Sequence, residues 1–109
     1  MDQLGTAAGP EMTFDVSGAE GGTVIVAIRG ELDISNINRL ETAVEPIIAK
    51  QPGRLVVDLR GLRFADSSAI AVWMRWATAV GGLELRDPSP VLRHVITSMG
   101  LAGKLLLEA

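Results

Sequence analysis

An alternation of apolar runs with segments of helical periodicity constrains the fold of this chain most strongly. Residues Thr23–Ile28 form a nearly continuous apolar run, as in strands buried on both faces, and Leu55–Leu59 is a second strand-like run. Between these runs, residues Ser35–Lys50 place apolar side chains on one face at a period of 3.6 residues. This order predicts an α/β domain: a small, mainly parallel or mixed β-sheet with helices packed on it.

Further strands are expected on either side of the two runs. They are a weak strand over residues 12–17, a short strand over Leu83–Arg86, and an apolar segment at 105–107 that fits a strand or a helical turn equally well. Glycines mark the turns, so a turn is expected over Gly18–Gly22, and Gly30 is expected to end the strand that begins at Thr23.

Three helices are expected, and each carries its own boundary signals. The first is capped by Ser35 and contains Pro46, which removes a backbone donor and predicts a kink or a broken last turn. The second follows a loop over Arg60–Asp66 and covers Ser67–Val80, where the Gly81-Gly82 pair ends it. The third begins with Ser89 as cap and Pro90 in the first turn. Its expected buried stripe is Leu92, Val95, Ile96 and Met99, and Gly100 is expected to end it, with Leu101 folding back toward Ile96.

The second helix is unusually apolar. Between Ala69 and Val80 only Arg75 and Thr78 are polar, and Trp73 and Trp76 are neighbours on one face because they are three residues apart. Such a helix is either buried nearly all round or presents part of its surface to a partner. Core packing is the commoner reason for the pattern.

Composition excludes several classes of function. The chain has 109 residues and 48% hydrophobic content, which fits one domain, and its formal net charge of -3 argues against binding to nucleic acid. It has no cysteine and a single histidine, His94, so no disulfide, thiol nucleophile or Cys/His metal site is expected, and no cofactor is expected.

Neither a secretion signal nor a membrane span is apparent in the sequence. The start lacks a positively charged, apolar leader, and no segment reaches the roughly 18 apolar residues of a membrane-spanning helix. A cytoplasmic protein with no membrane insertion is therefore expected. Residues 1–11 contain glycine, proline and small residues and are expected to be a flexible tail, with the domain covering residues 12–109.

The candidate site is the run Asp66-Ser67-Ser68. It lies beyond the carboxyl end of a predicted strand and at the start of a helix, where backbone N–H groups are unpaired and a phosphate is favoured. The commoner explanation for such residues is that Asp66 or Ser67 simply caps the helix. Two hydroxyls directly after an acid, in front of a very apolar helix, favour a phosphate-controlled contact site.

Three segments in this order and spacing resemble the STAS-domain anti-sigma factor antagonist family. They are Gly30-Glu31-Leu32-Asp33, the run from Asp58 to Ala69, and the run from Ser89 to Leu101. The resemblance implies the STAS fold and an unmodified form that binds an anti-sigma factor, itself a serine kinase, so that a sigma factor is released. It also implies phosphorylation at Ser67, which ends binding, and removal of the phosphate by a PP2C-type phosphatase.

The same resemblance assigns Asp33, Asp66, Ser67 and Ser68 to partner binding, with Ser67 as phosphoacceptor and Ser68 as a supporting hydroxyl bonded to the backbone. It implies a monomer or weak dimer. One departure concerns access to Ser67, because Ala69 stands where the family commonly has glycine.

Three further functions are weighed against this one. A stand-alone STAS protein can also be a subunit of an ABC-type lipid transporter that docks on the ATPase without a phosphorylation cycle. An enzyme is not expected, because Ser67 lies outside a Gly-x-Ser-x-Gly elbow and no phosphate-binding or dinucleotide glycine motif occurs. Nucleotide binding has no specific support in the sequence.

Overall fold

The structure is a computed structural model that describes residues 12–19, 22–101 and 103–108; the predicted tail at residues 1–11 lies outside this range. Its elements follow one another along the chain in an alternating order. They are β1 (Met12–Ala19), β2 (Thr23–Leu32), α2 (Ile37–Ile48), β3 (Arg54–Ala65), α3 (Ser67–Val80), β4 (Leu83–Arg86), α4 (Pro90–Ser98) and β5 (Leu105–Glu108).

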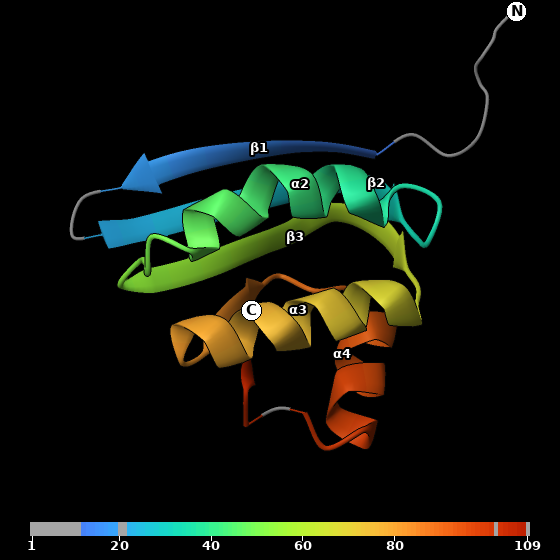
Figure 1. The fold of residues 1–109 in the computed structure, drawn as a ribbon. Coiled ribbons are helices and arrows are strands. Elements are labelled where there is room, and N and C mark those ends of the chain that lie inside the picture. The colour runs from blue at the N-terminus through green and yellow to red at the C-terminus, as the bar shows by residue number, and fades with distance from the viewer. Residues whose placement is uncertain (1–11, 20–21, 102, 109) are drawn as a thin grey trace, which may run out of the picture.

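The five strands form one mixed sheet in chain order, β1-β2-β3-β4-β5 (Figure 1). The first pair is antiparallel, with Met12 opposite Gly30, and every later pair is parallel. Pairing of β5 with β4 resolves the open choice at residues 105–107 in favour of a strand. The predicted α/β fold with a mixed sheet is confirmed.

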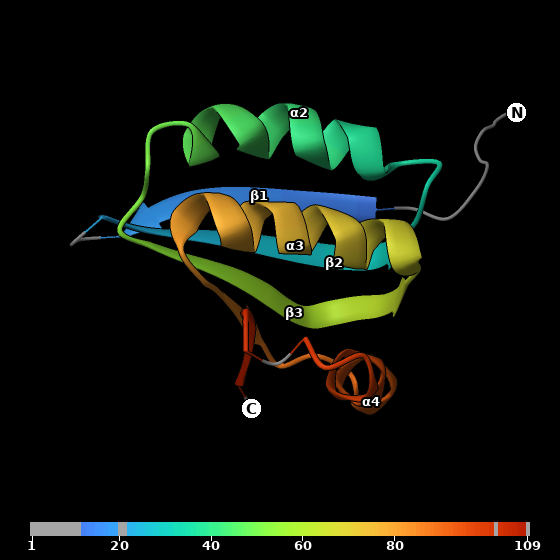
Figure 2. The ribbon, with the colours of Figure 1, turned by 60° about the horizontal axis from the view of Figure 1, so that its bottom comes forward.

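Helices α2 and α3 lie side by side over one face of the sheet (Figure 2), and α4 packs beside α3 and β5. The core lies between these two helices and the sheet. Both tryptophans of α3 belong to it, with Trp73 0% and Trp76 2% exposed, so core packing explains the apolar helix. Neither indole N–H has a hydrogen-bond partner among the described residues.

Three predicted strand boundaries are wrong. Strand β1 continues through Gly18, where a turn was expected to begin, to Ala19. Strand β2 continues through Gly30, which has φ 94°, to Leu32, and β3 continues to Ala65, where a loop over residues 60–66 was expected. The strands stay paired because register shifts absorb the irregularity: Ala27 lies opposite Asp58, but Arg29 lies opposite Gly61. A bulge of this kind has no signal in a single sequence, where a glycine predicts the end of a strand.

The start of α2 also differs from the prediction. The helix begins at Ile37, and Asn36 occupies the cap position, where Ser35 was expected to lie. Ser35 instead bonds to Asp33 in the preceding turn, with its N–H 2.9 Å from the Asp33 Oδ1. The helix continues through Pro46 and ends two residues later at Ile48, so the proline falls in the final turn.

The boundaries of α4 are largely as predicted. Ser89 caps the helix by accepting a hydrogen bond from the Leu92 N–H (3.2 Å), and Gly100 has φ 74°. The Leu101 N–H then donates to the Ile96 carbonyl at 3.1 Å, which confirms the predicted return of the chain. Met99 is exposed and does not join the buried stripe, because the helix ends at Ser98.

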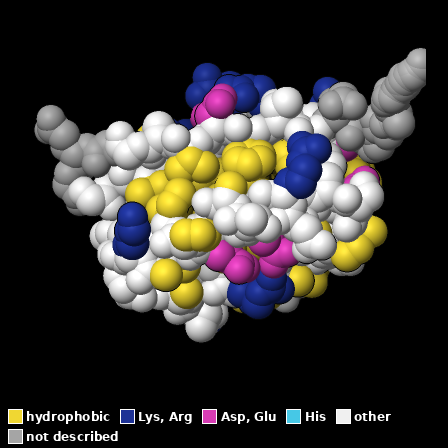
Figure 3. Space-filling model, turned by 45° about the horizontal axis from the view of Figure 1, so that its top comes forward, with side chains coloured by type: hydrophobic (Ala, Val, Ile, Leu, Met, Phe, Trp, Pro, Cys, Tyr) yellow, Lys and Arg dark blue, Asp and Glu magenta, His cyan; other side chains and the backbone are white. Residues whose placement is uncertain are grey.

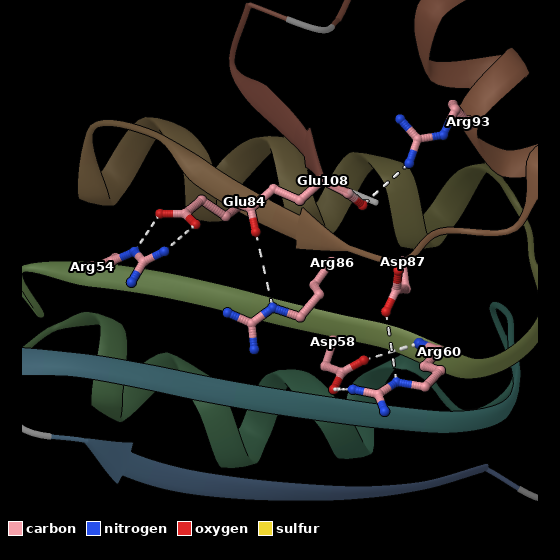
Figure 4. Close-up of polar contacts among 8 residues, drawn as sticks. All are labelled: Arg54, Asp58, Arg60, Glu84, Arg86, Asp87, Arg93 and Glu108. Carbon is pink, nitrogen blue, oxygen red and sulfur yellow. Dashed lines mark hydrogen bonds and ion pairs between the residues drawn. The ribbon is translucent and has the colours of Figure 1, made fainter.

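The sheet face opposite α2 and α3 carries ion pairs (Figure 4). Arg54 and Glu84 form a two-bond pair between β3 and β4, with N–O distances of 2.5 and 2.6 Å. This bonding to Arg54, with a further hydrogen bond from Glu108, lowers the pKa of Glu84 from 4.5 to about 2. Arg60 pairs with Asp58 and Asp87 in the same row.

Candidate functional site

The carboxyl ends of β2 and β3 meet at one end of the sheet. Leu32 and Ala65 are paired there, and each strand is followed directly by an aspartate, Asp33 and Asp66. The Asp66 N–H donates to the Leu32 carbonyl at 3.2 Å, which holds the start of α3 against the β2–α2 loop. Parallel pairing therefore brings together two acidic segments that lie more than thirty residues apart in the sequence.

Asp66 is the cap of α3, and its two carboxylate oxygens bond to different elements. Oδ1 accepts from the Ser68 N–H (2.9 Å), the Ala69 N–H (3.3 Å) and the Ser68 hydroxyl. Oδ2 accepts from the Ile34 N–H of the β2–α2 loop at 3.0 Å. The capping interpretation is thus correct for Asp66, which in addition joins α3 to that loop.

The charge of Asp66 is stabilised by these contacts. Its partial burial on its own raises the pKa of the carboxyl. Hydrogen bonds from the Ser68 hydroxyl and from the backbone N–H groups of Ile34, Ala69 and Ser68 more than compensate, so the pKa lies below its ordinary value. Asp66 is therefore ionised at neutral pH, and its lone pairs already face donors of the protein.

The two serines after Asp66 have different surroundings. Ser67 is the first residue of α3 and is exposed, and its hydroxyl has no hydrogen-bond partner among the described residues. Ser68 is half-buried and donates its hydroxyl to Asp66, not to the backbone as predicted. Ser67 is consequently the one of the two whose oxygen an approaching protein can reach without breaking a contact of the fold.

The β2–α2 loop, Asp33–Asn36, is ordered by side chains. Each of its four consecutive backbone N–H groups has an acceptor, and three of the acceptors are side-chain oxygens. The bonds run from Asp33 N to Asn36 Oδ1 (3.0 Å), Ile34 N to Asp66 Oδ2 (3.0 Å), Ser35 N to Asp33 Oδ1 (2.9 Å) and Asn36 N to the Asp33 carbonyl (3.1 Å). Asn36, which is buried, also donates to the Glu31 carbonyl at 2.9 Å.

Three exposed apolar side chains lie on the elements that meet near the start of α3. Ile34, which is 73% exposed, follows β2. Phe64, which is 51% exposed, lies next to the last residue of β3, and Val91, which is 74% exposed, lies in the first turn of α4. A hollow of about 250 Å³ lies between Phe64 and Val91, with Ile70 among its lining residues. We call the set Ile34, Phe64, Asp66, Ser67 and Val91 the Ser67 surface.

The sequence predicts Asp33, Asp66, Ser67 and Ser68 as partner-binding residues, and the structure brings all four to this end of the sheet. The prediction missed Ile34, Phe64, Val91 and Asn36. Asn36 lies inside the helix predicted from Ser35, and Phe64 and Val91 lie inside the predicted loop over residues 60–66 and the predicted third helix, so their pattern gives no reason to single them out. The extra carboxylate contact of Asp66 has no signal in a single sequence, because it depends on the parallel pairing.

Two polar residues of α4, Arg93 and His94, have contacts of their own. Arg93 donates to the Glu108 carbonyl at 3.1 Å, and His94 is exposed with Ser98 nearby. Within residues 12–19, 22–101 and 103–108, no cluster of three metal-ligating side chains occurs and no helix is long and apolar enough to span a membrane. On the face shown in Figure 3, charged side chains lie in small groups of both signs around a band of hydrophobic ones.

Comparisons with known proteins agree on one family. The family described as "Mlab, STAS domain" matches residues 16–108. A crystal structure of an anti-sigma factor antagonist from Mycobacterium paratuberculosis is 26% identical with a TM-score of 0.81, covering 90% of this chain and 86% of that one. SpoIIAA in its unphosphorylated form is 25% identical with a TM-score of 0.72, covering 89% of each chain.

The Bacillus cell fate determinant SpoIIAA in its phosphorylated form shares the fold, with a TM-score of 0.72 at 20% identity over 89% of this chain and 92% of that one. No curated protein sequence matches the chain.

Proposed function

The chain belongs to the STAS domain family, and from that premise we propose that it is an anti-sigma factor antagonist whose partner contact is switched at Ser67. The unphosphorylated form binds an anti-sigma factor that is also a serine kinase, and a sigma factor is released. Phosphorylation of Ser67 ends the contact, and a PP2C-type phosphatase restores it. The protein acts in the cytoplasm, by binding and not by catalysis, as a monomer or weak dimer.

The observation that carries the proposal is the exposed Ser67 beside an ionised Asp66, with the exposed apolar side chains of Ile34, Phe64 and Val91 on the neighbouring elements. A phosphate there adds about 1.5 to 2 negative charges at neutral pH. The Asp66 carboxylate one residue away, with its lone pairs already occupied, would repel it at an interface that excludes water. Apolar contacts that stabilise the unmodified complex would then be opposed by repulsion and desolvation.

The departure at Ala69 is compatible with this switch. Ala69 is fully buried, and its N–H donates to Asp66. Its methyl group therefore packs in the core on the inner side of α3, while Ser67 faces outward. Alanine in place of glycine is not expected to obstruct a kinase at Ser67.

The test is direct measurement of modification and binding. Purified anti-sigma factor kinases are incubated with the protein and ATP, and the phosphorylated residue is identified by mass spectrometry. Affinity is then measured by calorimetry for Ser67→Ala and Ser67→Asp. We expect phosphate on Ser67, unchanged affinity for the alanine variant, and at least about a tenfold loss for the aspartate variant.

A matched control is Ser98→Asp, which adds the same charge at an exposed serine of α4 outside the Ser67 surface. It should bind as the unmodified protein does. Equal affinity of the Ser67→Ala and Ser67→Asp variants would refute the switch.

Docking on the ATPase of an ABC-type lipid transporter is the second candidate, and the family description, which names Mlab, leaves it open. The two candidates differ in their response to charge at Ser67. A transporter subunit without a phosphorylation cycle should co-purify with an ATPase and should not be phosphorylated by anti-sigma factor kinases.

A further inference from the structure

The β2–α2 loop is ordered to a degree that its length and exposure do not require. Surface loops commonly leave backbone N–H groups to water, yet all four from Asp33 to Asn36 have protein acceptors. One acceptor, Asp66, comes from a different element, and another, Asn36, is the one buried polar residue among the described residues. The loop is therefore fixed in one conformation before any partner arrives.

The side chain at the centre of this loop is apolar. Ile34 is 73% exposed, and its own backbone N–H is the group that Asp66 Oδ2 binds. A single exposed isoleucine is ordinary on a protein surface. An exposed isoleucine whose backbone is held by a carboxylate, next to an unbonded serine hydroxyl, is a preorganised contact, because ordering it on binding costs little further entropy.

We propose that Asp66 is a positioning residue that fixes Ile34 as an apolar anchor of the Ser67 surface, and that the partner receives this side chain in an apolar pocket. The inference rests on the proposed function, since the partner is the protein whose binding Ser67 controls. Asp66 thus acts through Ile34, in addition to any repulsion it exerts on a phosphate.

The variant Asp66→Asn separates the two contacts of the carboxylate. Asparagine caps helices as well as aspartate does, so α3 should keep its start. Its amide has one acceptor oxygen, and when that oxygen serves Ser68 and Ala69, the NH₂ group faces the Ile34 N–H, donor against donor. The loop contact is then lost while the helix cap remains.

A double-mutant cycle tests the coupling. Binding is measured by calorimetry with the anti-sigma factor kinase that binds the Ser67→Ala variant. Ile34→Ala and Asp66→Asn should each bind this kinase about tenfold more weakly than the unmodified protein does. The double variant should bind about as weakly as Ile34→Ala alone, because Asp66 acts through that side chain. Val91→Ala is the matched control: Val91 is equally exposed but lies on α4, so its effect should multiply with that of Asp66→Asn.

Amide hydrogen exchange gives a readout that needs no partner. In Asp66→Asn the Ile34 N–H should exchange at least about tenfold faster, while the Leu40 N–H of α2 stays protected because the fold is intact. If the variant does not fold, the unmodified protein serves instead: the Ile34 amide proton shift should follow the titration of the Asp66 carboxyl in NMR spectra.

The inference would be overturned if the losses of affinity in Ile34→Ala and Asp66→Asn multiplied in the double variant. It would also be overturned if the Ile34 N–H exchange rate did not change in Asp66→Asn and its chemical shift did not follow the Asp66 titration. Equal binding by Ser67→Ala and Ser67→Asp refutes the proposed switch instead. In that case the exchange experiment still decides whether Asp66 positions Ile34.

Discussion

Ser67 and Ser68 are neighbours with opposite relations to Asp66. The Ser68 hydroxyl donates to the Asp66 Oδ1, and the Ser67 hydroxyl is free of described partners. Because hydrogen bonds lower the pKa of Asp66, the stability that its charge supplies is complete above its unfolded pKa and is lost as pH falls through the folded value. One serine therefore supports the fold, and the other is available for modification.

Replacing Ser68 tests whether its hydroxyl stabilises the charge of Asp66. Ser68→Ala removes one donor to Asp66, so the pKa of Asp66 should rise and the free energy of unfolding at pH 7 should fall by about 1 kcal/mol. NMR titration of the carboxyl and urea unfolding measure the two effects. Ser67→Ala is the control and should change neither quantity. An unaltered Asp66 titration in Ser68→Ala would contradict this assignment.

The side chain of Arg29 leaves no room for a Cβ atom at Gly61. A Cβ at Gly61 would lie 2.8 Å from Arg29 Cγ, close to the backbone of β2, and Arg29 is also held by Asp15. We expect Gly61→Ala to lower the free energy of unfolding by about 1 to 2 kcal/mol. In β1, a Cβ at Gly18 meets nothing within 4 Å, so Gly18→Ala should be neutral or stabilising. Equal effects in chemical denaturation would show that the Arg29 contact is unimportant.

At the scale of elements, the outcome of sequence reasoning depended on the range of the contacts involved. Helices α3 and α4 were predicted well because their signals are local: Asp66 and Ser89 cap them, and Gly81 and Gly100 take positive φ after them. The extensions of β2 and β3 were missed because they depend on a register shift between two strands. The same limit hid Ile34, whose position depends on a carboxylate from another element.

Pro46 offers a test of one element alone. It lies in the final turn of α2, where it cannot donate to the carbonyl of the preceding turn. Pro46→Ala restores that donor, and after allowance for the greater entropy of the unfolded chain we expect stabilisation by about 1 to 2 kcal/mol. The exposed neighbour Glu45→Ala should change stability by less than about 0.5 kcal/mol. Thermal unfolding of both variants makes the comparison, and destabilisation by Pro46→Ala would contradict it.

For the whole molecule, the sheet separates two kinds of surface. One face is covered by α2 and α3, and the opposite face carries ion pairs that join β3, β4 and β5 (Figures 2 and 4). The Ser67 surface lies at the end where β2 and β3 finish, so partner binding there leaves the ion-paired face free. Substitutions in the ion-paired face, such as Glu84→Gln, should therefore alter the pH dependence of stability without altering binding at Ser67.

Glu84 provides the test on the ion-paired face. Its folded pKa of about 2, below 4.5, means that its contribution is complete above about pH 4.5 and is lost as pH falls toward 2. Glu84→Gln should lower the free energy of unfolding at pH 7 by about 1 to 2 kcal/mol and flatten the pH dependence between these values. Glu45→Gln should do neither. Unchanged acid unfolding in Glu84→Gln would show that Arg54 does not stabilise the charge.

The antiparallel pairing of β1 has a practical consequence. Met12 lies opposite Gly30, so the described chain enters the sheet at the end where Ser67 lies (Figure 1). The opposite end of the sheet is the better place to attach a label. Lys50 is exposed just after α2, and the chain has no cysteine, so Lys50→Cys would give a unique thiol for attaching a fluorophore or a sensor chip. Immobilised in that way, the molecule would present Ser67 outward.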